Sequence, residues 1–160
     1  MNKNVFSEIV LKSTDSLYHI SKSILKNDAD CEDAVQEAIA IAFAKLHTLK
    51  KEQYAKTWLT RILINECYHI LRKRERFTPF SDYKEEPEWG LEDYSELYQA
   101  LFMLKKEYRL TIVLYYLEGY SVKEIAHIMN TGTGTVKSRL SRGRDKLKSI
   151  LEEENVYGII

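Results

Sequence analysis

Apolar residues in the first half of the chain recur three or four positions apart, which is the spacing of one buried helix face. Three segments show this pattern, and residues 4–26, 31–47 and 56–76 each predict an α-helix. A polar break at residues 27–30 separates the first two, and Asp30 is predicted to cap the second helix. Residues 48–55 are polar and predict a loop. The residues expected to face inward from the third helix are Leu59, Ile62, Leu63 and Ile70.

The helical spacing is interrupted and then resumes in the second half. Residues 77–95 contain both prolines of the chain, and residues 78–99 hold seven acids and one base. This composition predicts a flexible acidic linker. Residues 96–152 then predict four helices, with Gly119 ending the second. That second helix is expected to bury Leu110, Val113, Leu114 and Leu117. The predicted fold is all-α, with two small helical domains, residues 1–76 and 96–152, joined by the linker.

The most specific local pattern begins at Ser121. Ser121 and Glu124 have the spacing of a capping box, in which each side chain satisfies the other residue's backbone N–H. Ala126 allows close approach of a second helix, and Asn130 follows at a turn position where φ is often positive. Val136 would then fill the core from the second helix. The spacing predicts that the C-terminal domain is a four-helix helix-turn-helix domain that reads DNA.

The last predicted helix separates apolar from basic side chains. Residues 133–148 contain six basic residues and one acidic residue. Arginine and lysine reach guanine edges or phosphates, and hydroxyl groups donate or accept at either. The inward stripe is predicted to be Val136, Leu140, Leu147 and Leu151, and the DNA-contacting side chains are Thr135, Lys137, Ser138, Ser141 and Arg142. A merely solvated basic face is the alternative, and the preceding turn favours DNA binding.

The N-terminal half presents two polar stripes. Asp33, Gln36 and Glu37 share one side of the helix over 31–47, either as solvated residues near a helix start or as a docking face for a basic partner. The helix over 56–76 interleaves cations, an amide and an aromatic ring, a combination that suits single-stranded nucleic acid. Its predicted exposed line is Thr57, Arg61, Asn65, Tyr68 and Arg72, while Trp58 is assigned to the core.

The charge, the cysteines and the apolar segments of the chain limit the kinds of protein that it can be. The net charge is zero, so the basic C-terminal helix is balanced by acids elsewhere. Cys31 and Cys67 are far apart without metal-site spacing, and both are expected to be reduced. The start of the chain lacks the apolar segment of a signal peptide, and no run is long enough to insert into a membrane, which predicts a cytoplasmic protein. Nucleophile–base pairs, phosphate loops and metal clusters are missing from the sequence, so neither an enzyme nor a cofactor is predicted.

Three segments resemble the extracytoplasmic-function (ECF) sigma factors of the sigma-70 family. Asp30-Cys-Glu-Asp-Ala-Val-Gln-Glu-Ala38 resembles the segment that binds core RNA polymerase. Lys56-Thr-Trp-Leu-Thr-Arg-Ile-Leu-Ile-Asn-Glu66 is similar to the helix that melts and reads the promoter −10 element. Leu117-Glu-Gly-Tyr-Ser-Val-Lys-Glu-Ile-Ala126 and Gly134-Thr-Val-Lys-Ser-Arg-Leu-Ser-Arg-Gly-Arg144 resemble the −35-reading domain.

The resemblance implies a role for each matched position. Core polymerase would be bound by Asp30, Asp33, Gln36 and Glu37. The single-stranded −10 element would be bound by Lys56, Arg61, Asn65, Tyr68 and Arg72, and the duplex −35 element by the five side chains named on the last helix. The implied partners are core RNA polymerase, promoter DNA and an anti-sigma factor. A helix-turn-helix repressor or a response-regulator output protein is the alternative, but it would account for residues 96–151 alone.

Overall fold

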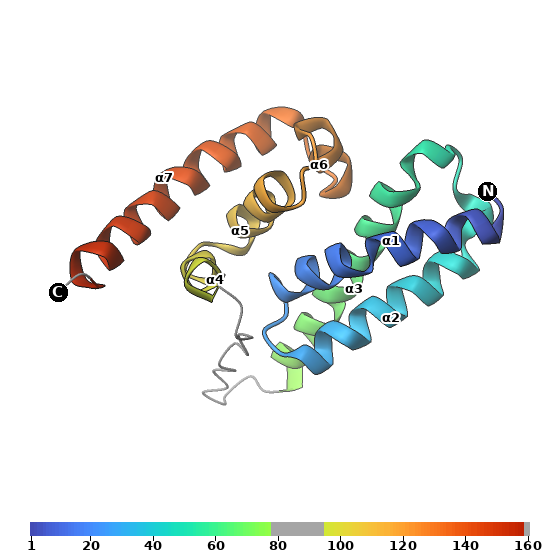
Figure 1. Cartoon of the computed structure of the whole chain (residues 1–160), viewed down its shortest axis with the longest axis horizontal. Helices are drawn as coiled ribbons and strands as arrows, with labels where there is room; N and C mark the ends of the chain where they lie inside the picture. Colours follow the sequence, from blue (N-terminus) through green and yellow to red (C-terminus); the bar gives the residue numbers. More distant parts are fainter. Residues whose placement is uncertain (78–94, 159–160) are drawn as a thin grey trace. The chain divides into compact units, whose positions relative to one another are not determined.

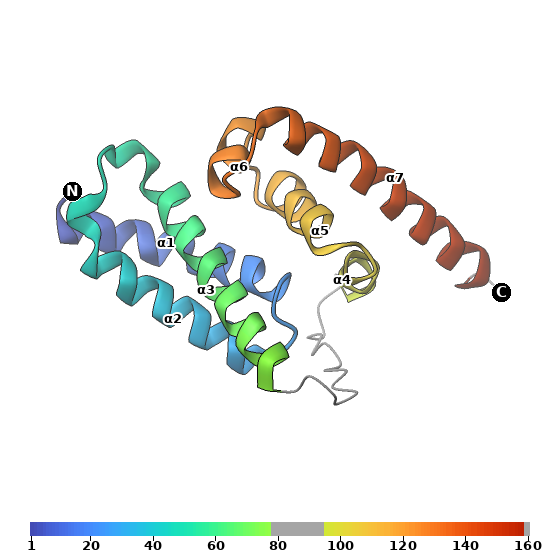
Figure 2. The same ribbon diagram turned by 180° about the vertical axis from the view of Figure 1, so that it is seen from behind.

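The computed structural model describes residues 1–77 and 95–158, and the described residues form helices joined by turns (Figures 1 and 2). The chain divides into an N-terminal unit within residues 1–88 and a C-terminal unit within residues 89–160. The predicted all-α fold is confirmed. The predicted acidic linker falls almost entirely on residues 78–94, which lie outside the described residues. Among the described helices, none is long and apolar enough to cross a membrane.

The N-terminal unit is built from three long helices that pack against one another in every pairing. They are α1 (Lys3–Lys22), α2 (Asp28–Ala44) and α3 (Ala55–Phe77), with short 3₁₀ turns η1 (Leu46–Thr48) and η2 (Glu52–Tyr54) between α2 and α3. The segment expected to be a loop therefore contains short helical turns. Both views show the end of α3 beside the start of α2 (Figures 1 and 2).

The core of the N-terminal unit follows from the helical spacing of its apolar residues. Phe6 is fully buried and meets the Phe43 and Trp58 rings edge-on, at centroid distances of 5.0 and 6.0 Å. Leu59 and Leu63 of α3 are fully buried, as predicted. Such aromatic pairs and buried aliphatic side chains supply most of the free energy that holds helices together.

Four expectations for the N-terminal unit are wrong. Asn27, not Asp30, caps α2, because the Asn27 side chain accepts from the Asp30 backbone N–H at 2.7 Å. Ile62 and Ile70 are only half-buried, and Thr57 is buried instead of exposed. The buried face of α3 also includes Thr60, Ile64 and Cys67, which brings Thr57 onto it and leaves Ile62 at its edge. Ile70 shares the face of Leu59 but lies three turns later, nearer the end of the helix.

The C-terminal unit consists of shorter helices arranged around α7. Its helices are α4 (Ser95–Phe102), α5 (Lys106–Ile112), α6 (Val122–Ile128) and α7 (Thr133–Gly158), and a π-helical turn, η3 (Val113–Leu117), continues α5. The expected helix near residues 133–152 is found, and it extends further, to Gly158. α4, α5 and α6 each contact α7. Val136 and Leu140 are buried against them, as predicted, whereas Leu147 and Leu151 of the same predicted stripe are only half-buried.

The π-turn moves Leu117 out of the predicted stripe. Leu110, Val113 and Leu114 are buried, but Leu117 is 41% exposed. The Glu118 N–H donates to the Val113 carbonyl, a bond that spans five residues instead of four. The wider turn shifts every later side chain by about one residue around the axis. The turn then ends at Gly119, whose φ of +75° confirms the predicted helix-ending glycine.

Candidate functional site

The helix-turn-helix has the predicted local chemistry. The Glu124 N–H donates to Ser121 Oγ at 3.1 Å, and the Ser121 N–H donates to Glu124 Oε1 at 3.0 Å. Asn130 has a φ of +52°, in the left-handed region that asparagine tolerates well. The Thr131 N–H donates to the Ala126 carbonyl at 2.9 Å. These bonds satisfy the backbone at both ends of α6 and fix the direction in which α7 leaves the turn.

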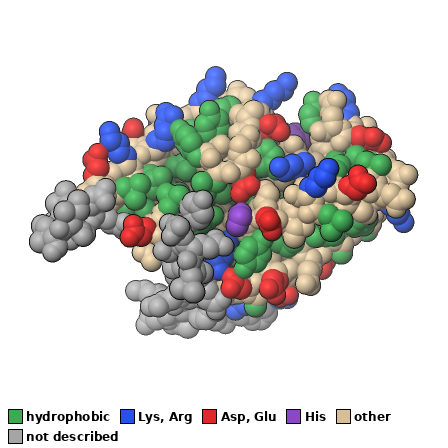
Figure 3. All heavy atoms as spheres, viewed as in Figure 1, with side chains coloured by type: hydrophobic (Ala, Val, Ile, Leu, Met, Phe, Trp, Pro, Cys, Tyr) green, Lys and Arg blue, Asp and Glu red, His purple; other side chains and the backbone are tan. Residues whose placement is uncertain are grey.

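The predicted −35 residues lie together on the first three turns of α7. Thr135, Lys137, Ser141 and Arg142 are exposed, and Ser138 is half-buried. They occupy the side opposite Val136 and Leu140, since residues on one helix face recur every three to four positions. Figure 3 shows Lys and Arg side chains projecting along the edge where α7 runs. This arrangement suits a helix that enters a DNA major groove.

Gly143 is a structural residue that the sequence analysis missed. A Cβ atom at this position would lie 2.7 Å from Ile112 Cδ1 and 3.4 Å from Tyr108 Cβ. The glycine therefore lets α7 approach α5 closely just after the predicted reading face. The available signal was a glycine inside a strong helical pattern, which costs about 1 kcal/mol relative to alanine and needs a packing reason.

A second missed feature is an apolar groove on the C-terminal unit, here called the α4–α7 groove. Its volume is about 480 Å³, and it is lined by Leu97, Leu101, Ile112, Tyr116, Leu117, Arg144, Leu147, Lys148, Leu151 and Glu152. Arg144 Nη1 donates to the Tyr116 hydroxyl oxygen at 2.9 Å. That bond and the neighbouring negative groups raise the pKa of Arg144, which stays charged in any case. The groove was not predictable because Tyr116 and Leu117 reach it through the π-turn.

The polar stripe of α2 divides into exposed and paired residues. Asp33, Gln36 and Glu37 are exposed on one side of the helix. Asp30 does not join them, because it is 6% exposed and its Oδ1 accepts from Arg74 Nη2 at 2.6 Å. The exposed trio is the acidic face referred to below.

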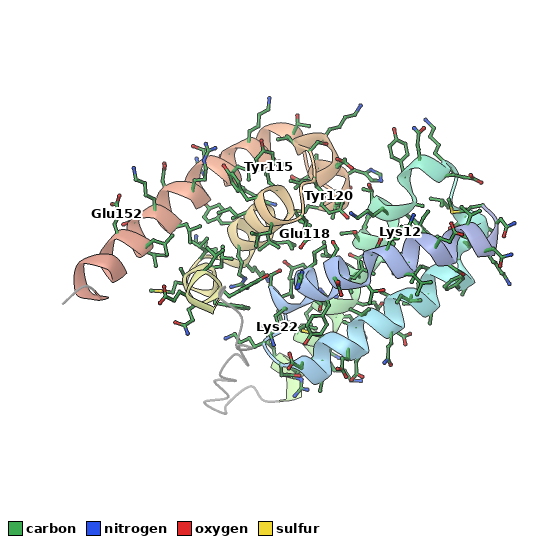
Figure 4. All side chains as sticks on the ribbon, in the orientation of Figure 1. Lys12, Lys22, Tyr115, Glu118, Tyr120 and Glu152 are labelled. Atoms are coloured by element: carbon green, nitrogen blue, oxygen red, sulfur yellow. The ribbon has the colours of Figure 1, made fainter. Side chains whose placement is uncertain are left out.

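Asp28, in the first turn of α2, also has partners inside the unit. Its carboxylate accepts from the Tyr18 hydroxyl at 2.6 Å and is paired with Lys22. Figure 4 shows Lys22 at the end of α1, where the chain turns into α2. Burial, together with the bond to Asp28, raises the pKa of Tyr18. The two acids at the start of α2 thus fasten α1 and α3 to it.

The five predicted −10 residues lie along α3, and of the line predicted to be exposed only Thr57 is buried. Asn65 and Arg72 are exposed and Arg61 is half-buried. Lys56 is exposed and Tyr68 half-buried, whereas Thr57 points into the core. A pocket of about 300 Å³ between α2 and α3, here called the α3 pocket, is lined by Ile41, Lys45, Trp58, Arg61, Ile62, Asn65 and Glu66. Trp58 therefore packs on Phe6 and also forms one wall of this pocket.

The cysteines are buried within the N-terminal unit. Cys31 and Cys67 are both free thiols and 0% exposed. Burial raises the pKa of Cys31 to about 11 and raises that of Cys67 as well. Within residues 1–77 and 95–158, no group of three or more His, Cys, Asp or Glu side chains is placed to hold a metal ion.

Comparisons with known proteins match both units. The family model described as sigma-70 region 2 matches residues 9–77, and that described as sigma-70, region 4 matches residues 94–147. The RNA polymerase sigma factor SigV of Bacillus subtilis is 32% identical, with 87% of this chain and 86% of that protein covered. The ECF RNA polymerase sigma factor SigW of the same organism is 29% identical, with 95% and 91% covered.

A solved structure is similar over the same length. The sigma factor RpoE from Bartonella quintana, solved in complex with the anti-sigma factor NepR, matches with a TM-score of 0.82 at 31% identity. The match covers 92% of this chain and 96% of that one. The similarity therefore extends over the described helices of both units.

Proposed function

Because the chain belongs to the ECF sigma factors of the sigma-70 family, we propose that its two units hold core RNA polymerase and promoter DNA through the surfaces described above. The function is binding and not bond-making: the chain directs core polymerase to promoters. The observation that supports the assignment best is that two sigma-70 regions match in order on two separate units. A repressor or a response-regulator output protein would leave the N-terminal match unexplained.

Core polymerase is proposed to bind the acidic face of α2. Asp33, Gln36 and Glu37 are exposed there, while the nearby acids Asp28 and Asp30 are occupied by internal partners. An exposed acid–amide surface fits a basic helical partner by charge complementarity, which raises association rates and selects the partner. We therefore narrow the expected docking residues to these three and leave Asp30 out.

The −10 strand is proposed to run along α3 and place one extruded base in the α3 pocket. The pocket offers an indole wall, Trp58, for stacking, and Arg61 and Asn65 to hydrogen-bond base edges. Tyr68 and Arg72 extend the same surface along the helix, while Lys56 lies at the start of α3 on another side of the axis. Both cations are proposed to reach phosphates. Capture of an unpaired base offsets part of the cost of opening the duplex.

The −35 element is proposed to be read by α7. Arg142 and Lys137 are exposed next to the hydroxyls of Thr135, Ser138 and Ser141. Core polymerase would hold the two units on one promoter, so that two weak contacts add through effective concentration. Since polymerase and chromosome are the partners, we place the chain's action in the cytoplasm.

An anti-sigma factor is proposed as the regulator, and the α4–α7 groove as one of its binding surfaces. The Bartonella quintana relative is solved with such a protein bound. The groove combines an apolar floor with Arg144 and Lys148 at its rim, which fits an amphipathic helix with acidic flanks. Removal of the groove's apolar side chains, as in Leu97→Asp, should abolish binding of the cognate anti-sigma factor in a pull-down.

The test of the whole proposal is run-off transcription with purified core polymerase on genomic fragments. The full chain should direct initiation at discrete start sites, and core polymerase alone should not. The charge-reversed variant with Asp33→Lys and Gln36→Lys should no longer co-purify with core polymerase. The proposal would be refuted if the purified chain did not bind core polymerase but bound a duplex operator tightly by itself.

A further inference from the structure

Two helix ends of the N-terminal unit are joined by one buried carboxylate. Asp30, in the first turn of α2, accepts from Arg74 Nη2 at 2.6 Å through Oδ1 and from Asn27 Nδ2 at 2.9 Å through Oδ2. The Asp30 side chain is 9% exposed and that of Arg74 is 44% exposed. A carboxylate with both oxygens bonded is held in one orientation. The end of α3 is therefore tied to the start of α2 across a sequence separation of 44 residues.

The pairing with Asp30 turns Arg74 in a different direction from Arg72 in the same basic segment. Residues 72–76 are Arg-Lys-Arg-Glu-Arg, and of these four cations Arg72 is the one assigned from the sequence to the −10 element. Residues two apart on an α-helix lie about 200° apart around the axis. Since Arg74 points at α2, Arg72 points away from it and is exposed.

We propose that Asp30 and Arg74 form a clasp that fixes the direction of the last turns of α3, and thereby the presentation of Arg72 to the −10 strand. The inference rests on the proposed function of α3 in −10 binding. Asp30 and Arg74 are positioning residues: neither contacts core polymerase or DNA. A buried ion pair contributes little net stability compared with apolar packing, but it selects one arrangement of the elements it joins.

The test is a double-mutant cycle on promoter opening by the holoenzyme. The proteins are Asp30→Asn, Arg74→Met and the double variant, with Arg72→Met alone and combined with Asp30→Asn to test whether the clasp acts through Arg72. An amide at position 30 cannot accept from both Asn27 and Arg74, while methionine keeps the length of the arginine stem. Opening is measured as permanganate reactivity of unpaired −10 thymines at saturating core polymerase.

Arg74→Met should reduce opening by roughly two- to twentyfold in the natural background and have no further effect when Asp30 is already asparagine. Arg72→Met should reduce opening by a larger factor in the natural background than in the Asp30→Asn background, because Arg72 is no longer held toward the strand once the clasp is broken. Core affinity should stay unchanged in Asp30→Asn. Arg74→Lys, which retains a charge within reach of Asp30, should recover most of the opening and serves as the second variant if Arg74→Met does not fold.

The salt dependence of DNA affinity distinguishes a residue that contacts a phosphate from one that only positions the helix. Arg72→Met should lower the slope of log affinity against log salt by roughly 0.7 to 0.9, as loss of one phosphate contact requires. In the Asp30→Asn background, where the clasp is already broken, Arg74→Met should leave the slope unchanged. A slope change with Arg74→Met in that background, or equal losses of opening from Arg74→Met in both backgrounds, would overturn the clasp and make Arg74 a DNA contact. If Arg72→Met has no effect on opening, the proposed −10 function of this helix end fails instead.

Discussion

The N-terminal unit holds its proposed binding surfaces through contacts between residues far apart in sequence. Arg74 reaches Asp30, and Tyr18 reaches Asp28, so the ends of α3 and α1 are both fixed on α2. The three helices share one continuous apolar core, in which Phe6 contacts rings from α2 and α3. The positions of its surfaces thus depend on burial and on the ionisation of paired groups.

The C-terminal unit holds α7, the proposed DNA-reading helix, through local backbone features instead. The capping box of Ser121 and Glu124 starts α6, the positive φ of Asn130 ends it, and Gly143 sets the approach of α7 to α5. The comparison teaches that a surface can be positioned either by distant charged pairs or by turns. The N-terminal unit also buries both cysteines, so its stability should respond to alkaline pH, whereas that of the C-terminal unit should respond to substitutions that change backbone preference.

Alkaline pH should destabilise the N-terminal unit more than the C-terminal unit, and this is the largest of the expected effects. Burial raises the pKa of Cys31 from 9.0 to about 11 and also raises the pKa of Cys67 and Tyr18. A raised pKa means that the folded state favours the neutral thiol, so this stabilisation is complete below about pH 9. It is lost as pH rises toward 11, and two pKa units correspond to about 3 kcal/mol for Cys31 alone.

Methyl NMR during urea unfolding measures this effect in each unit. Leu63 reports on the N-terminal unit and Val136 on the C-terminal unit, and both are fully buried. The Leu63 transition should move to lower urea between pH 9 and 11, while the Val136 transition moves less, because both cysteines of the chain lie in the N-terminal unit. Cys31→Ala should reduce the pH slope. If the Leu63 and Val136 transitions shifted equally between pH 9 and 11, the expected difference in pH dependence between the units would be wrong.

Loss of one base contact is the next largest effect and concerns binding instead of stability. Arg142→Ala should weaken holoenzyme binding to a cognate −35 element by about 1–3 kcal/mol if the guanidinium makes a bidentate contact to a guanine. The urea midpoint should not change, because Arg142 is exposed. Arg142→Lys keeps the charge and should lose the base preference. A uniform loss over all promoter sequences would instead identify a phosphate contact.

The same comparison explains which features were predictable. The capping box, Gly119 and Asn130 are local, so residue type and spacing were sufficient to predict them. The pairing of Asp30 with Arg74 joins distant segments, and the π-turn that exposes Leu117 leaves the helical pattern of residues 110–117 intact. Neither has a signature in spacing. Sequence reasoning therefore predicted the backbone of the helix-turn-helix well, but it placed Asp30 and Thr57 on surfaces that they do not reach.

Substitution of Asn130 tests whether the backbone conformation of this turn stabilises the C-terminal unit, and its expected effect is smaller. Its φ of +52° costs an alanine roughly 1–2 kcal/mol relative to glycine, and somewhat less relative to asparagine. Asn130→Ala should therefore lower the unfolding free energy of this unit by about 1 kcal/mol, measured from the Val136 methyl signal. Asn130→Gly should be neutral or slightly stabilising. Equal effects of alanine and glycine would show that backbone strain at this turn is not the controlling term.

Gly143→Ala has the smallest expected effect, because two opposing terms nearly cancel. Alanine raises helix propensity by about 1 kcal/mol, whereas overpacking costs about 1–3 kcal/mol. The new Cβ would meet Ile112 Cδ1 at 2.7 Å, so a net loss within about 1 kcal/mol is expected. Ile112→Val removes that Cδ1 atom. In the Ile112→Val background the same glycine substitution should become stabilising, and this change of sign, read from urea midpoints, identifies the α5–α7 contact as the reason for the glycine. If Gly143→Ala has the same sign in both backgrounds, that contact is not what the glycine accommodates.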